Sequence, residues 1–349
     1  LTSLSFSQER FYHIYEGWML LKGFEHLDNY TFLGLTENDM SGSHEILYHR
    51  TSLNGLHLNS NGFFIDSLMA TTFAFHSHAV YPTSSSLYLS GYAQYDVNRF
   101  YSMLLKFSNE TLDTVHSKIY GELIPDKQVL FQAINQLDSN LLILGRAFDY
   151  ETKFHLSLHK MDTLGNLIYS HDYAPTSSQS DADVGNPLQI VPATDGGFAI
   201  TFEERFSSGY MTNQDAYCLK VDSLGNEQWR CAIGHHDTVN YRPFVFPQEN
   251  GNYYFTYSDP MIVNTIGSDV SPMINDSSTI WFGEISAEGD VLWKRNLNRD
   301  INLQGSFYIN DVYEDEQGYI YLAGRQVYYD EMGILIKINP SHEAEWMQQ

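Results

Sequence analysis

Short apolar segments alternate with polar turns along the whole chain, at strand length rather than helix length. In one recurring pattern, an apolar strand ends in Lys and one more apolar residue, and an Asp-like residue opens a turn. An aromatic or apolar residue follows seven positions after that opener. The clearest copies have the openers Asp162 and Asp222 and the aromatic residues Tyr169 and Trp229. Apolar strands joined by a turn with Asp and Gly are typical of β-hairpins. The pattern therefore predicts a hairpin at each copy.

The same hairpin occurs six times, and its period predicts the architecture. The residues seven positions after the turn opener, here called the anchors, are Leu58, Val115, Tyr169, Trp229, Trp293 and Trp346. Successive openers lie 53 to 64 residues apart, which is longer than a helical repeat and suits a blade of four strands. We expect each anchor to pack between neighbouring blades.

A second type of hairpin lies between consecutive copies and supplies the inner half of each blade, as at 188–202 and 312–323. Six copies of two hairpins predict an all-β fold, a six-bladed β-propeller of four-stranded antiparallel blades that forms a single domain over residues 1–349. The expected blades are approximately 8–66, 67–122, 123–173, 184–233, 240–297 and 304–349. A seven-bladed propeller with a partial blade at the N-terminus is the alternative.

Composition and charge narrow the range of partners. Acidic residues outnumber basic ones by 43 to 19, which gives a net charge of −24. This charge repels phosphate groups, so we expect no nucleic-acid binding. No apolar run approaches the roughly 18 residues of a membrane span, so we expect no membrane insertion. The chain begins at Leu1 without the features of a signal peptide, which we interpret as the processed form of an exported protein or a fragment.

The two clearest repeats and the inner turn at 194–198 carry a family resemblance. Residues 160–166 read Lys-Met-Asp-Thr-Leu-Gly-Asn, and residues 220–226 read Lys-Val-Asp-Ser-Leu-Gly-Asn. With the Trp anchors, they resemble the repeats of β-propeller proteins that Bacteroidota export to the cell surface, many of them as type IX secretion cargo. The resemblance is strongest over 152–233 and 280–348. It implies an extracellular or cell-surface location and a modular, usually non-catalytic role such as adhesion.

Two cysteines flank one outer hairpin, where an exported protein could form a disulfide. A type I turn with a bulge at Gly225 would pair Asp222 with Asn226. Cys218 would then face Arg230, and Cys231 would lie on the opposite side of the sheet. We therefore expect two thiols, with Cys218 in the core.

Candidate metal ligands are present but incomplete. His76 with His78, and His235 with His236, lack further ligands at the spacing of a zinc site. The segment 181–185 resembles a calcium loop without its later acidic ligands. We therefore expect no metal and no cofactor, with calcium as the alternative.

Two acidic segments, Glu203–Glu204 and Glu314–Glu316, could supply the paired carboxylates of glycoside hydrolysis. Such pairs usually come from separate segments of a chain. We interpret both segments as solvated acids and expect no catalytic residues.

The connections between hairpins and between blades should lie on one face of a propeller, and here they are long: 174–187, 206–214, 234–242, 259–278 and 298–305. Long loops on a rigid scaffold often carry binding residues. Aromatic and Arg side chains in or beside them favour interfaces and sugar stacking. The candidate ligand-binding residues are Arg146, Tyr150, Tyr173, Phe206, Tyr210, Arg242, Arg325, Tyr328 and Tyr329.

Three functions fit these observations. The first is a secreted or cell-surface module for protein interaction or assembly, which contacts a protein or glycan of the cell envelope through the long-loop face. A glycan-binding adhesin or capture protein is the first alternative. A glycosidase or lyase on a propeller scaffold is the second, and it requires two carboxylates that face one cavity.

Overall fold

A computed structural model describes residues 19–348, apart from the segments 27–28, 39–42, 53–56, 65–71, 75–78, 97–98, 109–113, 122, 124–126, 138, 149–153, 177–182, 209–210, 235–239, 263–273, 300, 302–305 and 328–330. The described side chains begin at Ala79. Over this part of the chain, no helix is long and apolar enough to cross a membrane.

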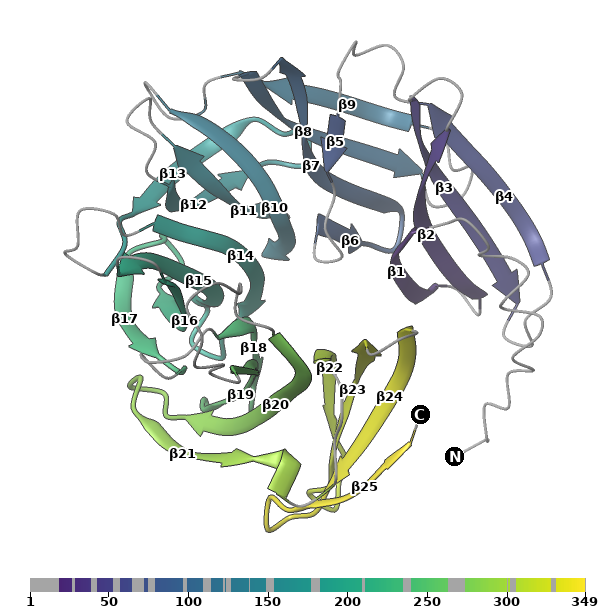
Figure 1. Ribbon diagram of the computed structural model, residues 1–349. Helices are drawn as coiled ribbons and strands as arrows, with labels where there is room; N and C mark the ends of the chain where they lie inside the picture. Colours follow the sequence, from purple (N-terminus) through teal and green to yellow (C-terminus); the bar gives the residue numbers. More distant parts are fainter. Residues whose placement is uncertain are drawn as a thin grey trace, which may run out of the picture. The chain divides into compact units, whose positions relative to one another are not determined.

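The described elements are strands, apart from a 3-10 helix at Leu297–Arg299. In the first sheet, β1 (Met19–His26), β2 (Asn29–Asn38), β3 (Ser43–Ser52) and β4 (His57–Phe64) are neighbours in chain order (Figure 1). The second contains β5 (Thr72–Ala74), β7 (Ser86–Asp96), β8 (Arg99–Ser108) and β9 (Thr114–Tyr120), and β6 (Val80–Pro82) also pairs with β7. The third contains β10 (Gln128–Leu137), β11 (Asn140–Phe148), β12 (Phe154–Met161) and β13 (Leu167–Tyr173).

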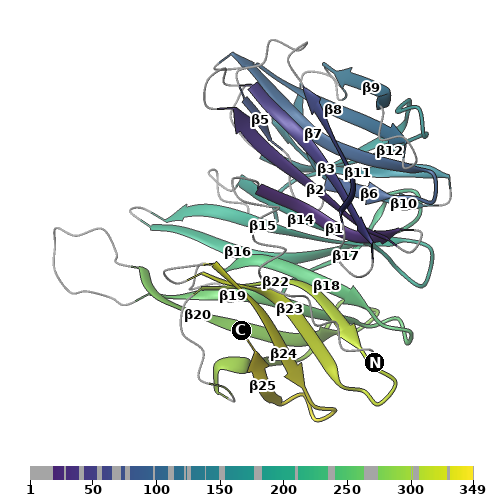
Figure 2. The ribbon, with the colours of Figure 1, turned by 90° about the vertical axis from the view of Figure 1, so that its right-hand side faces the viewer.

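The remaining three sheets repeat the four-stranded order. They are β14 (Asp183–Pro192), β15 (Phe198–Ser208), β16 (Met211–Val221) and β17 (Glu227–Ala232); β18 (Tyr241–Pro247), β19 (Tyr253–Ile262), β20 (Ile274–Ile285) and β21 (Val291–Asn296); and β22 (Ser306–Glu314), β23 (Ile320–Val327), β24 (Glu331–Ile338) and β25 (Ala344–Gln348). Figure 2 shows the last four side by side. These sheets confirm the predicted all-β class and the four-stranded antiparallel arrangement, while the number of blades stays a prediction.

The chain divides into two compact units. One comprises residues 1–150 and 157–170, and the other comprises 151–156 and 171–349. The division passes through β12 and β13, so the third sheet contributes strands to both. That the whole chain is one domain stays a prediction.

The outer turns close through their aspartates. In the turn between β16 and β17, Asp222 Oδ1 accepts hydrogen bonds from the backbone N–H groups of Leu224 at 2.9 Å and Asn226 at 2.8 Å. Gly225 has a φ of 85°, in the left-handed region that favours glycine. Hydrogen bonds from the Asn226 side chain and backbone hold the pKa of the Asp222 carboxyl below its usual value. The equivalent turn at Asp162 has the same bonds.

A β-bulge follows the turn in five outer hairpins. In the β16–β17 pair, Val221 faces Glu227 and Lys220 faces Trp229, so that Gln228 is an extra residue. The extra residues of the other four are Leu58, Val115, Leu292 and Glu345. The anchor position is thus the residue after the bulge.

The prediction that Val115 is an anchor is therefore wrong, and Leu58 lies at the same bulge position with a side chain that is not described. Both are the extra residue of a bulge, and Val115 is 60% exposed. The register places Asn59 and His116 opposite the residues that correspond to Lys220. In the first hairpin five residues separate Thr51 from His57, as five separate Val221 from Glu227, so the position equivalent to Asp222 is Ser52 and not Thr51. In the second hairpin six residues separate Phe107 from Thr114. Counting seven positions from Thr51 or Ser108 therefore ends one residue early.

The prediction is confirmed for two Trp anchors. Trp229 donates its Nε1–H to Ala287 O at 2.9 Å, in the outer turn of the next sheet. A Cβ built on Gly289 in that turn would lie 2.7 Å from Trp229 Cδ2, so the ring packs tightly there. Trp293 stacks on His342 of the following turn, with ring centroids 4.1 Å apart.

Similar hydrogen bonds connect other pairs of successive sheets. The Tyr120 hydroxyl donates to Gly165 O at 2.8 Å, and the Tyr173 hydroxyl donates to Gly225 O. With Trp229 and Ala287, these bonds place an aromatic donor on an outer strand and a backbone acceptor in the next outer turn. The outer turns are therefore docking points as well as connections.

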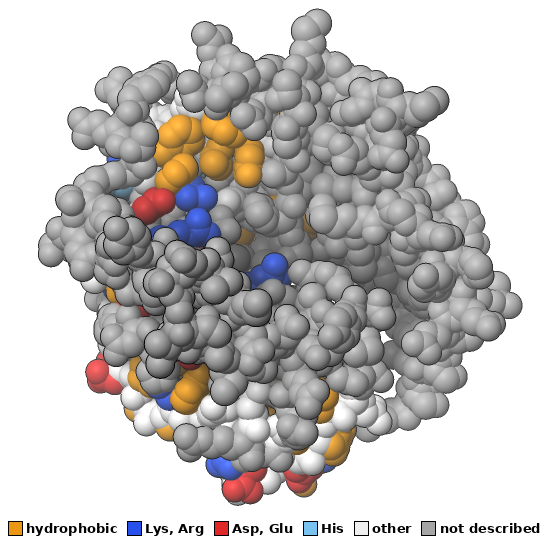
Figure 3. Space-filling view, in the orientation of Figure 1, with side chains coloured by type: hydrophobic (Ala, Val, Ile, Leu, Met, Phe, Trp, Pro, Cys, Tyr) orange, Lys and Arg blue, Asp and Glu red, His pale blue; other side chains and the backbone are white. Residues whose placement is uncertain are grey.

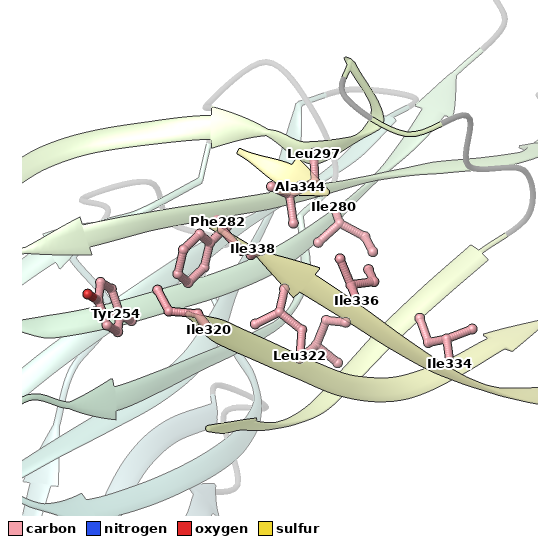
Figure 4. Packing of buried hydrophobic residues seen from close by; sticks show 11 residues of the cluster. Tyr254, Ile280, Phe282, Leu297, Ile320, Leu322, Ile334, Ile336, Ile338 and Ala344 are labelled. Carbon is pink, nitrogen blue, oxygen red and sulfur yellow. The ribbon is translucent and has the colours of Figure 1, made fainter. Parts of the chain in front are cut away.

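Apolar side chains from the inner and middle strands fill the space between sheets. Figure 4 shows one such cluster, in which Phe282 of β20 packs with Ile320 and Leu322 of β23 and with Ile336 and Ile338 of β24. All five are completely buried. Strands covered on both faces explain why the sequence reads as apolar runs.

The bulge also corrects the predicted position of the cysteines. Gln228 shifts the register by one residue, so Cys218 faces Cys231 instead of Arg230. Cys218 is fully buried, as expected of a core thiol, and both cysteines are free in the structure.

Candidate carboxylate site

Several segments expected to be long loops continue the strands. β15 and β16 remain paired to Ser208 and Met211, and β19 and β20 remain paired to Ile262 and Ile274. The expected loop 206–214 is thus mostly hairpin, and both described ends of the expected loop 259–278 are paired strand. The apolar segment 263–273 lies outside the described residues.

Three acids lie toward this end of the β15–β16 hairpin. The exposed fractions of Glu203, Glu204 and Asp215 are 3%, 0% and 1%. We call these residues the β15–β16 acidic cluster. The expectation that Glu203 and Glu204 are solvated is wrong, because both side chains are buried.

The register separates the three acids into two groups. Glu204 faces Asp215 across the ladder, and residues directly opposite on neighbouring strands share a face of the sheet. Glu203 precedes Glu204 on the same strand and so points to the other face. Two residues further into the hairpin, Phe202 and Tyr217 form the next pair on the Glu204 face, with stacked rings whose centroids lie 5.6 Å apart.

Glu204 is fixed from two directions. Its Oε1 accepts hydrogen bonds from the backbone N–H of Thr176 at 2.8 Å and from the Thr176 hydroxyl at 3.0 Å. Arg230 Nη1 lies 3.4 Å from the same oxygen, and the guanidinium sits over the Phe202 ring at 5.6 Å. Arg230 Nη1 also donates to Ala174 O at 2.8 Å, which ties the connection after β13 to this carboxylate.

The pKa of Tyr217 reflects the burial of its side chain and the charges around it. Its pKa lies well above the usual value, first because the phenol is buried and then because the charges of Glu204 and Asp215 oppose a phenolate. Arg230 acts in the opposite direction. Both carboxylates are therefore close enough to act on one hydroxyl.

Glu203 organises the opposite face. Its Oε1 accepts the backbone N–H of Arg242 at 3.0 Å, and Arg242 has a φ of 50°. A Cβ built on Gly185 would lie 3.0 Å from Glu203 Cβ, so β14 approaches here at the distance that glycine allows. A left-handed non-glycine residue beside a buried acid is the type of strain that clusters at functional sites.

The predicted ligand-binding residues have different environments. Arg242 contacts the acidic cluster through its backbone, Arg146 lies on β11 opposite Leu130, and Tyr173 is buried with its hydroxyl bound to Gly225 O. Phe206 and Arg325 lie in β15 and β23 with side chains that are not described, and Tyr150, Tyr210, Tyr328 and Tyr329 lie outside the described residues. Their binding roles stay predictions.

On the face drawn in Figure 3, Lys and Arg side chains lie next to hydrophobic ones.

The other candidate sites offer less. Glu314 and Glu316 are exposed, as expected. Asp183 Oδ1 accepts the Phe154 backbone N–H at 2.9 Å, whereas His76, His78, His235 and His236 lie outside the described residues. Within the described part of the chain, no group of three or more His, Cys, Asp or Glu side chains could hold a metal ion.

Comparison with known proteins supplies the fold. No protein-family model matches the sequence, and no curated protein matches it either. The α-L-arabinofuranosidase Arb93A from Fusarium graminearum superimposes with a TM-score of 0.56 at 11% identity, over 93% of this chain and 94% of that one. The Penicillium chrysogenum α-L-arabinanase complexed with arabinobiose also has a TM-score of 0.56, at 10% identity over 92% and 93%. The chain is a β-propeller.

These matches correct the first functional interpretation. The arabinofuranosidase and the arabinanase, each matched over more than nine-tenths of both chains, are glycoside hydrolases by their names. They support the second alternative, a glycosidase, over the non-enzymatic interaction module. Asp215 and Arg230 are the site residues that the sequence did not reveal, and the uninterrupted β15–β16 register is the signal that could have revealed Asp215.

Proposed function

We propose that this propeller is a glycoside hydrolase in which Glu204 and Asp215 are the paired carboxylates. The observation that carries the proposal is their direct opposition on β15 and β16, buried and on one face. Directly opposite residues have Cβ atoms about 4.5–5.5 Å apart. Retaining glycosidases hold their two carboxyl groups about 5–5.5 Å apart. The pair comes from two strands of one sheet, rather than from different blades.

The contacts suggest separate roles for the two acids. Arg230 and Thr176 favour the ionised form of Glu204, which suits a nucleophile. Asp215 then protonates the leaving oxygen and later removes a proton from water. Tyr217 is positioned beside both acids. The names of the matching hydrolases make α-L-arabinofuranosyl linkages the first substrate class for this role.

The test is hydrolysis of 4-nitrophenyl α-L-arabinofuranoside and of linear arabinan. Glu204→Gln and Asp215→Asn should each lower kcat by about 10²- to 10⁴-fold, with unchanged circular dichroism. Glu249→Gln, in an exposed turn, is the matched control and should keep full activity. Proton NMR of the first product should show retained anomeric configuration.

Two results would contradict this assignment. Full activity in both variants would show that acids other than Glu204 and Asp215 catalyse the hydrolysis. A wild-type chain that hydrolyses neither these substrates nor a wider panel of aryl glycosides would reject the hydrolase proposal.

We further propose that the protein acts outside the cell as type IX secretion cargo. The resemblance of residues 152–233 and 280–348 to exported propeller repeats supports this location. Antibody detection on intact, protease-treated cells and in the culture medium tests it. A signal confined to the cell interior would contradict export, and secretion that persists in a strain lacking the type IX pathway would contradict the route.

A further inference from the structure

The two cysteines have the geometry of a cross-strand pair. Cys218 on β16 faces Cys231 on β17. The Ile233 N–H donates to Ala216 O at 2.9 Å, two residues further along both strands, so the cysteines occupy a hydrogen-bonded position of the ladder. Cα atoms at such positions are about 5.5 Å apart in a regular sheet. That separation lies within the range of about 4.4–6.8 Å that a disulfide spans.

The environment of the pair is apolar, and only one thiol is accessible. Cys218 is completely buried in a cluster with Ala199, Ala216 and Phe255, and the half-buried Cys231 packs against this cluster. Burial raises the pKa of Cys231 to about 12. Burial and then the charge of Cys231 raise the pKa of Cys218 well above its usual value. The influence of one sulfur on the other is consistent with their facing positions.

We propose that Cys218 and Cys231 form a dithiol site that disulfide-exchanging oxidants such as glutathione disulfide convert to a cross-strand disulfide. Cys231 loses its proton to water, and its thiolate attacks one sulfur of the oxidant, which leaves as a thiolate. The Cys218 thiolate then attacks the Cys231 sulfur of the mixed disulfide and releases the second thiolate. Two cysteine sulfurs are oxidised, the disulfide of the oxidant is reduced, and its two thiolates take up the two protons.

Oxidation would lock the β16–β17 hairpin. The bond closes the loop 218–231 and restricts the unfolded chain more than the folded one, because the strands already hold the two residues opposite each other. This role is independent of the proposed hydrolase activity.

The experiment starts from the reduced full chain in glutathione buffers of increasing oxidised fraction, with acid quenching, intact-mass measurement and peptide mapping. We expect a product lighter by two hydrogens, a 218–231 cross-link and a melting temperature higher by about 3 to 6 °C. The rate should rise close to tenfold per pH unit from about pH 7 to 9, because the attacking sulfur must first be deprotonated.

Two variants separate the steps. Cys218→Ala should stop at the mixed disulfide on Cys231, whereas Cys231→Ser should form neither the adduct nor the cross-link. If the native wild type keeps both thiols in excess glutathione disulfide while the urea-unfolded chain forms the cross-link, the proposal is overturned. A mixed disulfide that persists on native wild-type Cys231 would overturn it as well.

Discussion

At the residue scale, similar side chains differ in importance according to the strand register. Trp229 follows the bulge and reaches the next turn, whereas Val115 is the extra residue of its own bulge and points into solvent. The sequence pattern treated both as anchors. The difference is a shift of one position, which reverses the side of the sheet to which a side chain points.

Replacing Trp229 with Ala should lower the free energy of unfolding by about 2 kcal/mol, less than for a fully buried aromatic residue because the ring is half-exposed. The variant loses the bond to Ala287 O and the edge contact with Tyr253. Urea denaturation measures the change. Val115→Ala is the control and should change stability by less than about 0.5 kcal/mol. Equal losses in the two variants would refute this reading of the bulge.

Two left-handed glycines form a matched pair for a second prediction. Gly196 has a φ of 82° and no atom within 4 Å of a built Cβ, while Gly225 has a φ of 85° and His171 Cδ2 at 2.5 Å. Gly196→Ala should cost about 1 kcal/mol through backbone strain alone. Gly225→Ala should cost at least about 1 kcal/mol more, because the His171 ring must also move from its bond to Leu224 O. Thermal unfolding of the two variants measures these costs. A lower stability for Gly196→Ala than for Gly225→Ala would contradict the prediction.

At the element scale, turn chemistry could be predicted and strand register could not. Asp, Gly and Asn in the turns at 162 and 222 act as their residue types require, so the hairpins follow from sequence. The bulge residues Gln228, Leu292 and Glu345 share no property, because an extra residue is not paired and its side chain is free to vary. For that reason the sequence does not predict the pairing of Cys218 with Cys231.

The acidic cluster illustrates the same limit for the candidate site. Glu203 and Glu204 stand out in the sequence, and the pairing of Glu204 with Asp215 follows once β15 and β16 are extended without a bulge. Their burial depends on the neighbouring strands and on the connection at Thr176, which are distant in sequence. Contacts between residues that are distant in sequence cannot be predicted from the local pattern of apolar and polar residues.

The inner turn at Asp195 leads to a prediction about acid stability. Burial raises the pKa of this carboxyl, but the Lys220 hydrogen bonds and the Gly197 N–H outweigh it and lower the pKa below the usual value. A carboxyl with a lowered folded-state pKa stabilises the fold above its unfolded pKa, and that contribution disappears as the pH falls through the folded value. The loss should therefore occur below about pH 4.

Asp195→Asn should cost about 0.5–1 kcal/mol at pH 7, a value reduced for solvent screening because the Asp195 side chain is 50% exposed. The cost should become smaller in urea melts as the pH falls below about 4. Glu316→Gln, an exposed acid, should show little difference at either pH. A penalty for Asp195→Asn that is the same at pH 3 and pH 7 would exclude the ionic contribution.

At the scale of the whole molecule, the repeats share geometry more than sequence. Five outer hairpins have the same bulge, although only some have an aromatic residue after it. A single-domain propeller should unfold in one calorimetric transition with equal calorimetric and van't Hoff enthalpies. Two separate transitions would indicate that the compact units 1–150 with 157–170 and 151–156 with 171–349 unfold independently.

The bonds from aromatic donors to Gly165 O, Gly225 O and Ala287 O bear on how such a chain evolves. Every residue has a backbone carbonyl, so the receiving turn needs no particular side chain to accept its neighbour. A duplicated segment of the gene then carries its own donor and meets a ready acceptor in whichever repeat follows. Repeats can accordingly be copied and can diverge without paired compensating mutations, which accounts for turns as different as 222–226 and 286–290 at equivalent positions in one protein.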